Sequence, residues 1–479
     1  MSKPDILIFL SDQHNAMLTG FSGDKIVRTP NMDKLAADGT FFKAAYTPSP
    51  LCVPARSAFL SGLLPEKTMC FENGSVLPGD RATFIHSIAA EGYETVLCGR
   101  MHFMGEDQRH GFTKRLVGDM TPLIWGRGGD LRKDLGPYVA TLANRYAKVV
   151  GGGTSPVLEY DRAVIAAALE YLAAPHDKPQ CVVVGTYGPH HTYVAPPELF
   201  KEYLEKVPEP VANEKNRNFK LNEILAGKVP DLPDDTKHRI KAAYYGMITQ
   251  LDSQLGEVRS AWEVYLKRQN REGVFVYISD HGDQIGEHGL YNKTTYFEGS
   301  AAIPMIFEGF GVQKGRSITG AVSLLDVGPT LCEMIGAEPL PEQDGKSLAA
   351  QLAGGPDQTE RSVLSEFLDR SASHGLTPSR MIRKGKWKYV AYAGFENEDL
   401  MFDISADPHE LHNCILEHPK EALELHDEIY KDWDIPGIIK KSQIMFKHMH
   451  LLSRWGAAVD VPESERWLIP EKARQLPVI

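Results

Sequence analysis

The chain has 479 residues, 42% of them hydrophobic and 24% charged, which is typical of a globular protein and excludes a disordered or fibrous one. Its 52 Lys and Arg against 63 Asp and Glu give a formal net charge of −11, and no basic run of the nucleic-acid-binding type is present in the sequence. We therefore expect no nucleic-acid partner, and the length allows a large domain together with a smaller one.

The N-terminal stretch MSKPDILIFLSDQHN contains an apolar run that stops at Ser11 and is too short for the core of a signal peptide. No later segment approaches the length of a membrane span, so we expect a soluble, cytoplasmic protein without a membrane partner. The cysteines form no C-x-x-C pair and no zinc-type spacing, which indicates reduced thiols. They are Cys52, Cys70, Cys98, Cys181, Cys332 and Cys414.

Apolar, β-branched runs alternate with helical patterns along most of the chain, which predicts an α/β fold with a mixed, mainly parallel sheet flanked by helices. In chain order the predicted strands are ILIFL (6–10), ETVLCG (94–99), CVVVGTY (181–187) and VFVYIS (274–279). The predicted helices are TPNMDKLAADG (29–39), with Asn31 as N-cap and Gly39 as its end, an amphipathic helix within 155–174, and a longer one over 235–269. The segment 205–234 is rich in Pro, Asn, Lys and Glu and is predicted to form a surface excursion or lid.

Polar residues follow each of these predicted strands. They are Asp12, then Arg100 and His102, then His190, and finally Asp280 and His281. Each alone is an ordinary turn or capping residue, but ligands in an open α/β sheet bind beyond the carboxyl ends of the strands. We therefore expect these side chains to converge in one site.

The stretch PSPLCVPARSAFLS (48–61) predicts a helix that begins near Cys52, since Pro54 suits a first turn and Gly62 an end. The free N–H groups of a helix N-terminus favour an anion, and Arg56 adds a positive charge within one turn. Such a site would lower the pKa of a thiol or hold an anionic substrate. A buried structural cysteine is the alternative.

After about Leu364 the pattern changes to that of a smaller α+β domain, so we expect a catalytic domain over 1–364 and a C-terminal domain over 365–479. RKGKWKYVAYA (383–393) predicts a strand, and EDLMFDISADPHELHN (398–413) a strand that leads through a turn to a helix. The tail from about Lys440 is predicted either to pack on the parent domain or to reach a neighbouring subunit. We favour a homo-oligomer.

The sequence CVPAR followed by SAFLSG resembles the signature of the sulfatase family, whose cysteine is oxidised to Cα-formylglycine. DILIFLSDQ, TPNMDKLAADGTFF and MFDISADPHE resemble further segments of that family. Residues 99–112 and 279–304 are most similar to its choline-sulfatase branch. The resemblance implies an alkaline-phosphatase/sulfatase-like large domain and a maturing enzyme that acts on Cys52.

A metal centre is expected from Asp12, Asp280 and His281, with Gln13 as an amide ligand. Carboxylate and amide oxygens suit Ca²⁺ or Mg²⁺, and the imidazole leaves room for Mn²⁺. The resemblance favours calcium, because the family is usually calcium-dependent. Gln13 departs from the second Asp of many relatives.

The resemblance also implies roles for the remaining residues. His190 and Lys293 match positions that protonate or stabilise the leaving oxygen, His102 matches the base for the second hydroxyl of the formylglycine hydrate, and Arg56 would hold that hydrate. Arg100 stands where the family has Lys, and it is expected to bind sulfate because a guanidinium is no proton donor near neutral pH.

The substrate is expected to be a carbohydrate or aryl sulfate, because Arg127, Arg132 and Lys133 suit an anionic sugar or aryl group. Choline sulfate is the close rival. Residues that would suit a quaternary ammonium group are Trp125, Tyr291, Tyr296, Phe297 and Glu366. A phosphonate monoester or phosphodiester hydrolase on the same fold, and an unmodified binding protein without catalysis, are the remaining alternatives.

Overall fold

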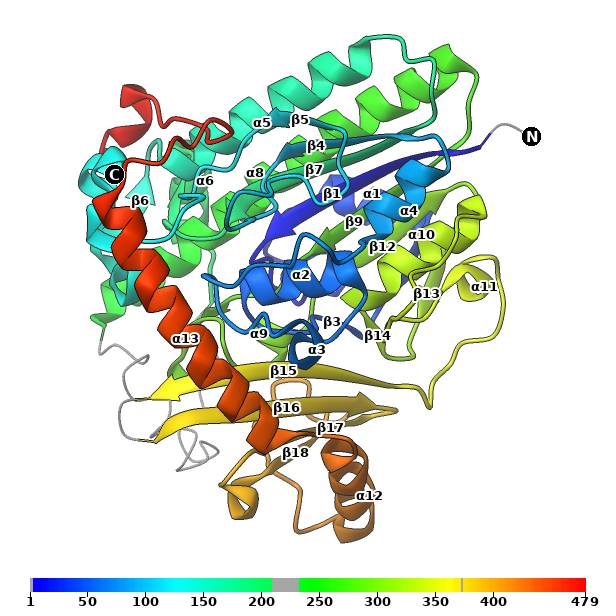
Figure 1. The fold of residues 1–479 in the computed structure, drawn as a ribbon, viewed down its shortest axis with the longest axis vertical. Helices are drawn as coiled ribbons and strands as arrows, with labels where there is room; N and C mark the ends of the chain where they lie inside the picture. Colours follow the sequence, from blue (N-terminus) through cyan, green and yellow to red (C-terminus); the bar gives the residue numbers. More distant parts are fainter. Residues whose placement is uncertain (1–2, 209–231, 372–373) are drawn as a thin grey trace.

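The computed structural model describes residues 3–208, 232–371 and 374–479 (Figure 1). Most of the predicted surface excursion or lid, residues 209–231, lies outside the described residues. No described helix is both long enough and apolar enough to cross a membrane.

The large domain is built on an eight-stranded sheet of order β13-β2-β12-β9-β1-β7-β4-β5. All four predicted strands lie adjacent in its centre and run parallel: β1 (Asp5–Asp12), β4 (Glu94–Gly99), β7 (Gln180–Pro189) and β9 (Gly273–Ser279). β12 (Met305–Gly309) is antiparallel to β9 and to β2 (Thr40–Phe42), while β5 (Lys114–Val117) and β13 (Arg316–Ile318) are parallel edge strands. The predicted mixed, mainly parallel α/β sheet is therefore confirmed.

Helices cover both faces of this sheet (Figure 1). Leu7 and Phe9 of β1 face one layer, which contains α1 (Pro30–Asp38), α5 (Pro156–Ala173) and α8 (Asp234–Gln269). Ile6, Ile8 and Leu10 alternate onto the other layer, which contains α2 (Cys52–Ser61), α4 (Phe84–Ala90) and α10 (Val327–Ile335). Because both faces are buried, the central strands read as continuous apolar runs.

Shorter elements complete the large domain. They are the helices α3 (Pro65–Thr68), α6 (Pro197–Leu204), α9 (Glu298–Ala301) and α11 (Ala349–Leu352) and the strand pairs β3 (Ala45–Tyr46) with β14 (Val322–Ser323), β6 (Gly151–Gly152) with β8 (Val194–Ala195), and β10 (Gln284–Ile285) with β11 (Tyr291–Asn292).

The smaller C-terminal part is an antiparallel sheet of β15 (Ser362–Ser371), β16 (Gly375–Lys384), β17 (Trp387–Tyr392) and β18 (Leu400–Asp403), packed against α12 (Pro419–Tyr430) and α13 (Ile435–Ala458). The strand predicted over 383–393 is confirmed as β17, but it begins only at Trp387, because Gly385, with φ 54°, turns the chain between β16 and β17. The helix predicted within 398–413 is also wrong, because that segment continues as turns and the next helix begins at Pro419.

The chain after α13 returns to the large domain. Ile469 and Ala473 enter the core on the α5–α8 face, and Trp467 packs against it. At the end of the chain, the backbone oxygen of Ile479 accepts a hydrogen bond from Gly152 N at 2.8 Å. Of the two predicted alternatives, the tail therefore packs on its parent domain.

The N-terminus of α1 is capped from a distant element. The helix begins at Pro30, so the prediction of Asn31 as N-cap is wrong, and Thr29 in that position makes no side-chain capping bond. Instead, Asp252 of α8 accepts hydrogen bonds from Met32 N at 2.8 Å and from Asn31 N and Nδ2 at 3.2 and 2.8 Å. A carboxylate at a helix N-terminus satisfies free N–H groups and complements the helix dipole.

We predict that Asp252→Ala lowers the free energy of unfolding by about 1–3 kcal/mol, because buried N–H donors of α1 lose their acceptor. Chemical denaturation measures the change. Ser253→Ala, at the exposed neighbouring position of α8, is the matched control and should stay within about 0.5 kcal/mol of wild type. Equal stability of the two variants would contradict the capping role.

Candidate active site

The carboxyl ends of β1, β4, β7 and β9 meet at one edge of the sheet, where the predicted polar residues converge. The register pairs Asp12 with Pro189 and Ser11 with Ser279, so that His190 and Asp280 follow directly beside Asp12. Gln13 and His102 adopt left-handed backbone conformations, with φ of 66° and 60°, as the chain turns out of β1 and β4. The structure brings together the residues predicted for catalysis, sulfate binding and metal binding, namely Asp12, Gln13, Cys52, Arg56, Arg100, His102, His190, Asp280, His281 and Lys293.

Cys52 is the first residue of α2 and is 1% exposed. As predicted, Pro54 lies in the first turn and Gly62, in the left-handed region, ends the helix. The Cys52 Sγ lies 3.2 Å from Lys293 Nζ and 3.2 Å from His281 Nε2. The Cys52 thiol therefore joins α2 to the two groups beyond β9, the imidazole of His281 and the ammonium of Lys293.

Asp12, Cys52, Asp280 and His281 form a buried group whose ligand atoms all lie within 4.8 Å of one another. His281 Nδ1 donates to the carbonyl oxygen of Gly282 at 2.9 Å, so its Nε2 lone pair is directed toward the group. This is the usual arrangement of a metal-ligating histidine. The donor set fits a divalent cation, and Gln13, whose Oε1 accepts from Lys293 Nζ, offers a further amide oxygen.

Arg56 links the carboxylates of this group. Its Nε donates to Asp280 Oδ2 at 2.8 Å, its Nη2 to Asp12 Oδ2 at 3.1 Å and its Nη1 to the backbone oxygen of Arg100 at 3.1 Å. Burial alone would raise the pKa of Asp12, but neighbouring positive charges, led by that of Arg100, hold this pKa well below its usual value. The carboxylate is therefore charged and able to ligate a metal.

Arg100 is fully buried, and each of its three guanidinium nitrogens donates a hydrogen bond. Its Nε donates to Asp12 Oδ2 at 2.5 Å, its Nη1 to Asp119 Oδ1 at 3.1 Å and its Nη2 to His102 Nδ1 at 2.8 Å, while its guanidinium lies 4.1 Å from the ring centroid of Tyr187. Burial and the charge of Arg100 lower the pKa of His102. Because Nδ1 accepts from Arg100, the neutral ring carries its proton on Nε2.

His190 and Lys293 lie at the mouth of the same site. His190 Nδ1 donates to the backbone oxygen of His191 at 2.6 Å, and burial together with the charge of Lys293 holds the pKa of His190 well below its usual value. Burial also opposes the charge on Lys293, but its interactions with Cys52 Sγ and with the nearby Asp12 carboxylate outweigh it and raise the Lys293 pKa. Lys293 is thus a fixed cation and His190 a neutral imidazole with Nε2 available.

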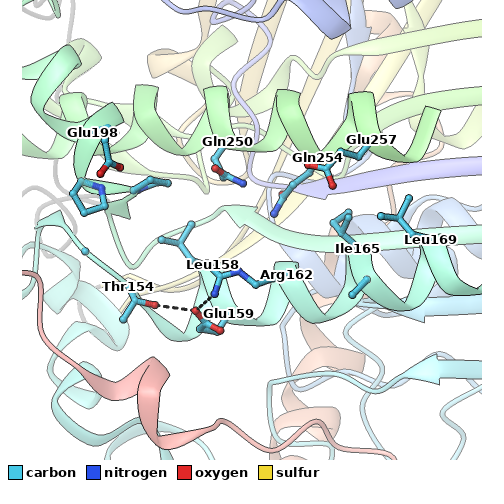
Figure 2. A pocket seen from close by; sticks show the side chains of 14 residues that line it. Thr154, Leu158, Glu159, Arg162, Ile165, Leu169, Glu198, Gln250, Gln254 and Glu257 are labelled. Atoms are coloured by element: carbon cyan, nitrogen blue, oxygen red, sulfur yellow. Dashed lines mark hydrogen bonds and ion pairs between the residues drawn. The ribbon is translucent and has the colours of Figure 1, made fainter. Parts of the chain in front are cut away.

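A cavity of about 390 Å³ opens over these groups. Its lining consists of Leu51, Cys52, Asn73, Arg100, His102, Tyr187, His190, His191, Tyr291, Asn292, Lys293 and Thr294. A larger cavity, about 640 Å³, lies elsewhere between α5 and α8, where Gln250, Gln254 and Glu257 line one side (Figure 2). It contains none of the predicted site residues.

Sequence reasoning missed two residues that organise the site. Asn73 Oδ1 accepts a hydrogen bond from Val53 N at 3.1 Å and so caps α2 from outside the helix. Asp119 holds Arg100 and follows the edge strand β5, just as Asp12 ends β1. The second residue could have been found from that strand-then-carboxylate pattern, whereas the first lies in a loop with no such signal.

Most residues considered for the substrate lie away from the cavity. Tyr291 lines it, but Tyr296 and Phe297 belong to an apolar cluster and Glu366 pairs with Arg380 at 2.8 Å. The hypothesis that Arg127, Arg132 and Lys133 face the substrate is not supported. Arg127 pairs with Asp460 at 2.9 Å and Glu463 at 3.5 Å, Arg132 pairs with Asp134 at 3.4 Å, and Lys133 lines a different cavity.

The fold and the site define an α/β protein in which a candidate divalent-metal group lies beside a buried cysteine at a helix N-terminus. Comparison with known proteins identifies the family: the model named Sulfatase matches residues 4–337, and the model named N-sulphoglucosamine sulphohydrolase, C-terminal, matches residues 286–432. The chain belongs to the sulfatase family and is a sulfuric ester hydrolase.

Among characterised relatives, a choline-sulfatase of Rhizobium meliloti (strain 1021) is 32% identical over 98% of this chain and 92% of its own. An arylsulfatase K of Gallus gallus is 28% identical over 90% of this chain and 82% of its own. The crystal structure of a phosphonate monoester hydrolase of Agrobacterium radiobacter superposes with a TM-score of 0.72 at 23% identity, over 89% of this chain and 94% of that one. The shared fold is the alkaline-phosphatase-like α/β fold.

We predict that His281→Ala weakens divalent-cation binding by at least about ten-fold, because the Nε2 donor is lost from the group. Calorimetric titration of chelator-treated protein with Ca²⁺, Mg²⁺ and Mn²⁺ measures both the affinity and the preferred ion. His412→Ala, at an exposed histidine, is the control and should bind as wild type does. An unchanged affinity in the His281 variant would remove this residue from the metal site.

Proposed function

We propose that this sulfuric ester hydrolase cleaves an organic O-sulfate with a nucleophile made from Cys52, which a sulfatase-maturing enzyme would oxidise to Cα-formylglycine. The observation that carries the proposal is the position of Cys52 Sγ, 3.2 Å from both Lys293 Nζ and His281 Nε2 and beside the carboxylate of Asp12. Oxidation replaces the thiol by an aldehyde, whose hydrate supplies an oxygen nucleophile at the same point.

Asp12, Gln13, Asp280 and His281 are the proposed metal ligands. The carboxylate and amide oxygens support Ca²⁺, our first choice, or Mg²⁺, and the imidazole leaves Mn²⁺ as an alternative. When bound, the cation would act as a Lewis acid toward a sulfuryl oxygen and the nucleophile.

Arg100 and Lys293 are the proposed cations for the sulfuryl oxygens. Both line the cavity and are held in place, Arg100 by Asp12 and Asp119 and Lys293 by Gln13. Cations that are fixed before substrate arrives stabilise developing charge without reorganising. Arg56, buried behind Cys52, would instead keep the metal carboxylates and the modified residue 52 in register.

His190 is the proposed proton donor to the leaving oxygen. Its Nδ1–H donates to the carbonyl of His191, so Nε2 must first take up a proton from solvent, a step that the negative charge of a bound sulfate ester would favour, and it would then pass this proton to the leaving oxygen. Lys293 would support the same oxygen electrostatically. His102 is the proposed base at residue 52, and in that role it must release its hydrogen bond from Arg100 so that the ring can carry its proton on Nδ1.

The cavity lining favours a neutral aryl or sugar group on the ester. Around the charged groups it presents the aromatic rings of Tyr187 and Tyr291 and the neutral polar side chains of Asn73, Asn292 and Thr294. No carboxylate is among the described lining residues, although a quaternary ammonium group would favour one. With Arg127 engaged elsewhere, the described lining offers an anionic sugar no cation beyond Arg100 and Lys293, which are assigned to the sulfate.

Choline sulfate is the second candidate, favoured by the choline-sulfatase that is 32% identical over 98% of this chain. A phosphonate monoester or phosphodiester hydrolase is the third, suggested by the shared fold of the Agrobacterium radiobacter enzyme. An unmodified binding protein would follow if Cys52 remained a thiol.

The decisive experiment is the mass of the tryptic peptide Ala44–Arg56 from protein coexpressed with a formylglycine-generating enzyme. We predict that Cys52 has become an aldehyde, while the buried Cys98 in its own peptide remains a thiol. Cys52→Ala should lower kcat/KM on an aryl sulfate by at least about 10³-fold, the scale of losing a nucleophile. A persistent thiol in fully active protein would refute the assigned chemistry.

A substrate panel separates the candidates. We predict that 4-nitrophenyl sulfate and glucose 6-sulfate have higher kcat/KM than choline-O-sulfate or 4-nitrophenyl phenylphosphonate, because the cavity has aromatic and neutral polar walls. Tyr291→Ala should raise KM for the aryl ester by roughly ten-fold, since stacking area is lost. Preference for choline-O-sulfate or for the phosphonate would instead establish the second or third candidate.

A further inference from the structure

Asp119 lies behind the site, fully buried, in the turn that follows β5. Its Oδ1 accepts hydrogen bonds from Arg100 Nη1 at 3.1 Å and from Thr121 N at 2.9 Å. Its Oδ2 accepts from the backbone N–H of His102 at 2.9 Å. One carboxylate therefore fixes both the proposed sulfate-binding cation and the backbone of the proposed base.

Water could not replace the contacts that Asp119 makes with Arg100 and His102. Arg100 is fully buried, and without Asp119 one end of its guanidinium would lose its counter-charge in a site that excludes water. His102 has a φ of 60°, a conformation that non-glycine residues rarely adopt, so its backbone depends on a specific anchor. The hydrogen bond that His102 N donates to Asp119 Oδ2 supplies that anchor.

The turn that carries Asp119 is in turn held by the C-terminal tail. Trp467 N donates to the Asp119 backbone oxygen at 3.0 Å, and Arg466 forms an isolated parallel bridge with Asp119. Gly118 lies so close to this strand of the tail that a Cβ there would overlap the backbone oxygen of Glu465.

A second side chain of the tail secures the same segment. Glu463 accepts hydrogen bonds from Leu123 N at 2.5 Å and Ile124 N at 3.1 Å, a few residues beyond Asp119. On the other side of the segment, Tyr160 of α5 donates to the Gly118 backbone oxygen at 2.9 Å. Its ring packs edge-on against Trp467, with ring centroids 5.2 Å apart. The turn is thus clamped between α5 and residues 463–467.

We infer that Asp119 is a positioning residue for the reaction and that residues 463–467 hold it there, which makes the C-terminal tail a required support of the active site. The inference rests on the proposed function only in the roles given to Arg100 and His102. Asp119 would touch neither substrate nor metal. It would act through the guanidinium of Arg100 and the backbone N–H of His102.

Asp119→Asn tests the first half of the inference. The amide keeps the shape but replaces one acceptor oxygen by a donor, so it cannot accept from both Arg100 and His102 N. We expect kcat/KM on the aryl sulfate to fall about 10–100-fold and the inhibition constant of inorganic sulfate to rise about as much, with divalent-metal content unchanged. Asp119→Glu, which keeps the charge, should recover part of the loss.

Trp467→Ala and Glu463→Ala test the tail, since the second removes the acceptor of Leu123 N and Ile124 N. We expect each to change kcat/KM and sulfate inhibition in the same direction as Asp119→Asn, and to add little in the Asp119→Asn background, because both would act through one residue. Lys472→Ala is the matched control, since Lys472 is a tail residue that pairs with Glu159 rather than with the Asp119 turn. Thermal unfolding of each variant separates a change in positioning from loss of the fold.

Wild-type catalysis is measured first, so that the two proposals fail separately. If wild type turns over no sulfate ester, the proposed function falls, and calorimetric binding of inorganic sulfate to the same variants still decides the positioning role. Folded Asp119→Asn protein with wild-type sulfate affinity and kcat/KM would overturn the role of Asp119. Tail variants whose effects add fully to Asp119→Asn would overturn the coupling to the tail.

Discussion

The bridge that Arg56 makes between the buried carboxylates of Asp12 and Asp280 is the constraint on which the site depends. These carboxylates end β1 and β9, and they could not share a space of a few ångströms without compensating charge. Because Arg56 reaches them from the second turn of α2, the same contact fixes the helix that carries Cys52. One ion-pair network therefore sets the distance between the candidate metal group and Cys52, the source of the proposed nucleophile.

The wider charge balance of the site suits its substrate. The cations Arg56, Arg100 and Lys293 face the carboxylates Asp12, Asp119 and Asp280, while burial lowers the pKa of His102, His190 and His281 so that these imidazoles are neutral. A divalent cation would then leave the site with excess positive charge. That excess complements a sulfate ester, because the ester is an anion and further negative charge develops on its leaving oxygen as the S–O bond breaks.

The charged residues of this site could be predicted from the sequence because their positions depend on local sequence patterns. A polar residue that follows an apolar strand must lie at the carboxyl edge of the sheet, whichever strands pair, and Asp12, Arg100, His190 and Asp280 all follow that rule. The start and end of α2 followed from Pro54 and Gly62 for the same reason. These inferences needed no knowledge of strand order.

What the sequence could not predict depends on contacts between distant segments. Asp252 caps α1 across more than two hundred residues, which is why the local pattern favoured Asn31. The residues considered for the substrate were chosen by type, yet Phe297 and Glu366 serve packing and pairing while Arg127 serves the tail. Residue type alone does not say which side of a loop faces a cavity, since that is decided by tertiary packing.

The charged groups of the site and its neutral rim come from different parts of the fold, so the preference for the alcohol part of the substrate can change by itself. The charged groups come from strand ends and α2, where register and buried ion pairs fix their positions. The neutral rim comes largely from loops and short elements that contribute Leu51, Asn73, Tyr291 and Thr294, and these side chains carry none of the buried charge network. Substitution at the rim can therefore exchange one alcohol or phenol for another while the sulfate-handling groups stay in place. The alcohol portion of the substrate is accordingly the feature that this site constrains least, and the charged group that the strand ends and α2 surround is the one that it constrains most.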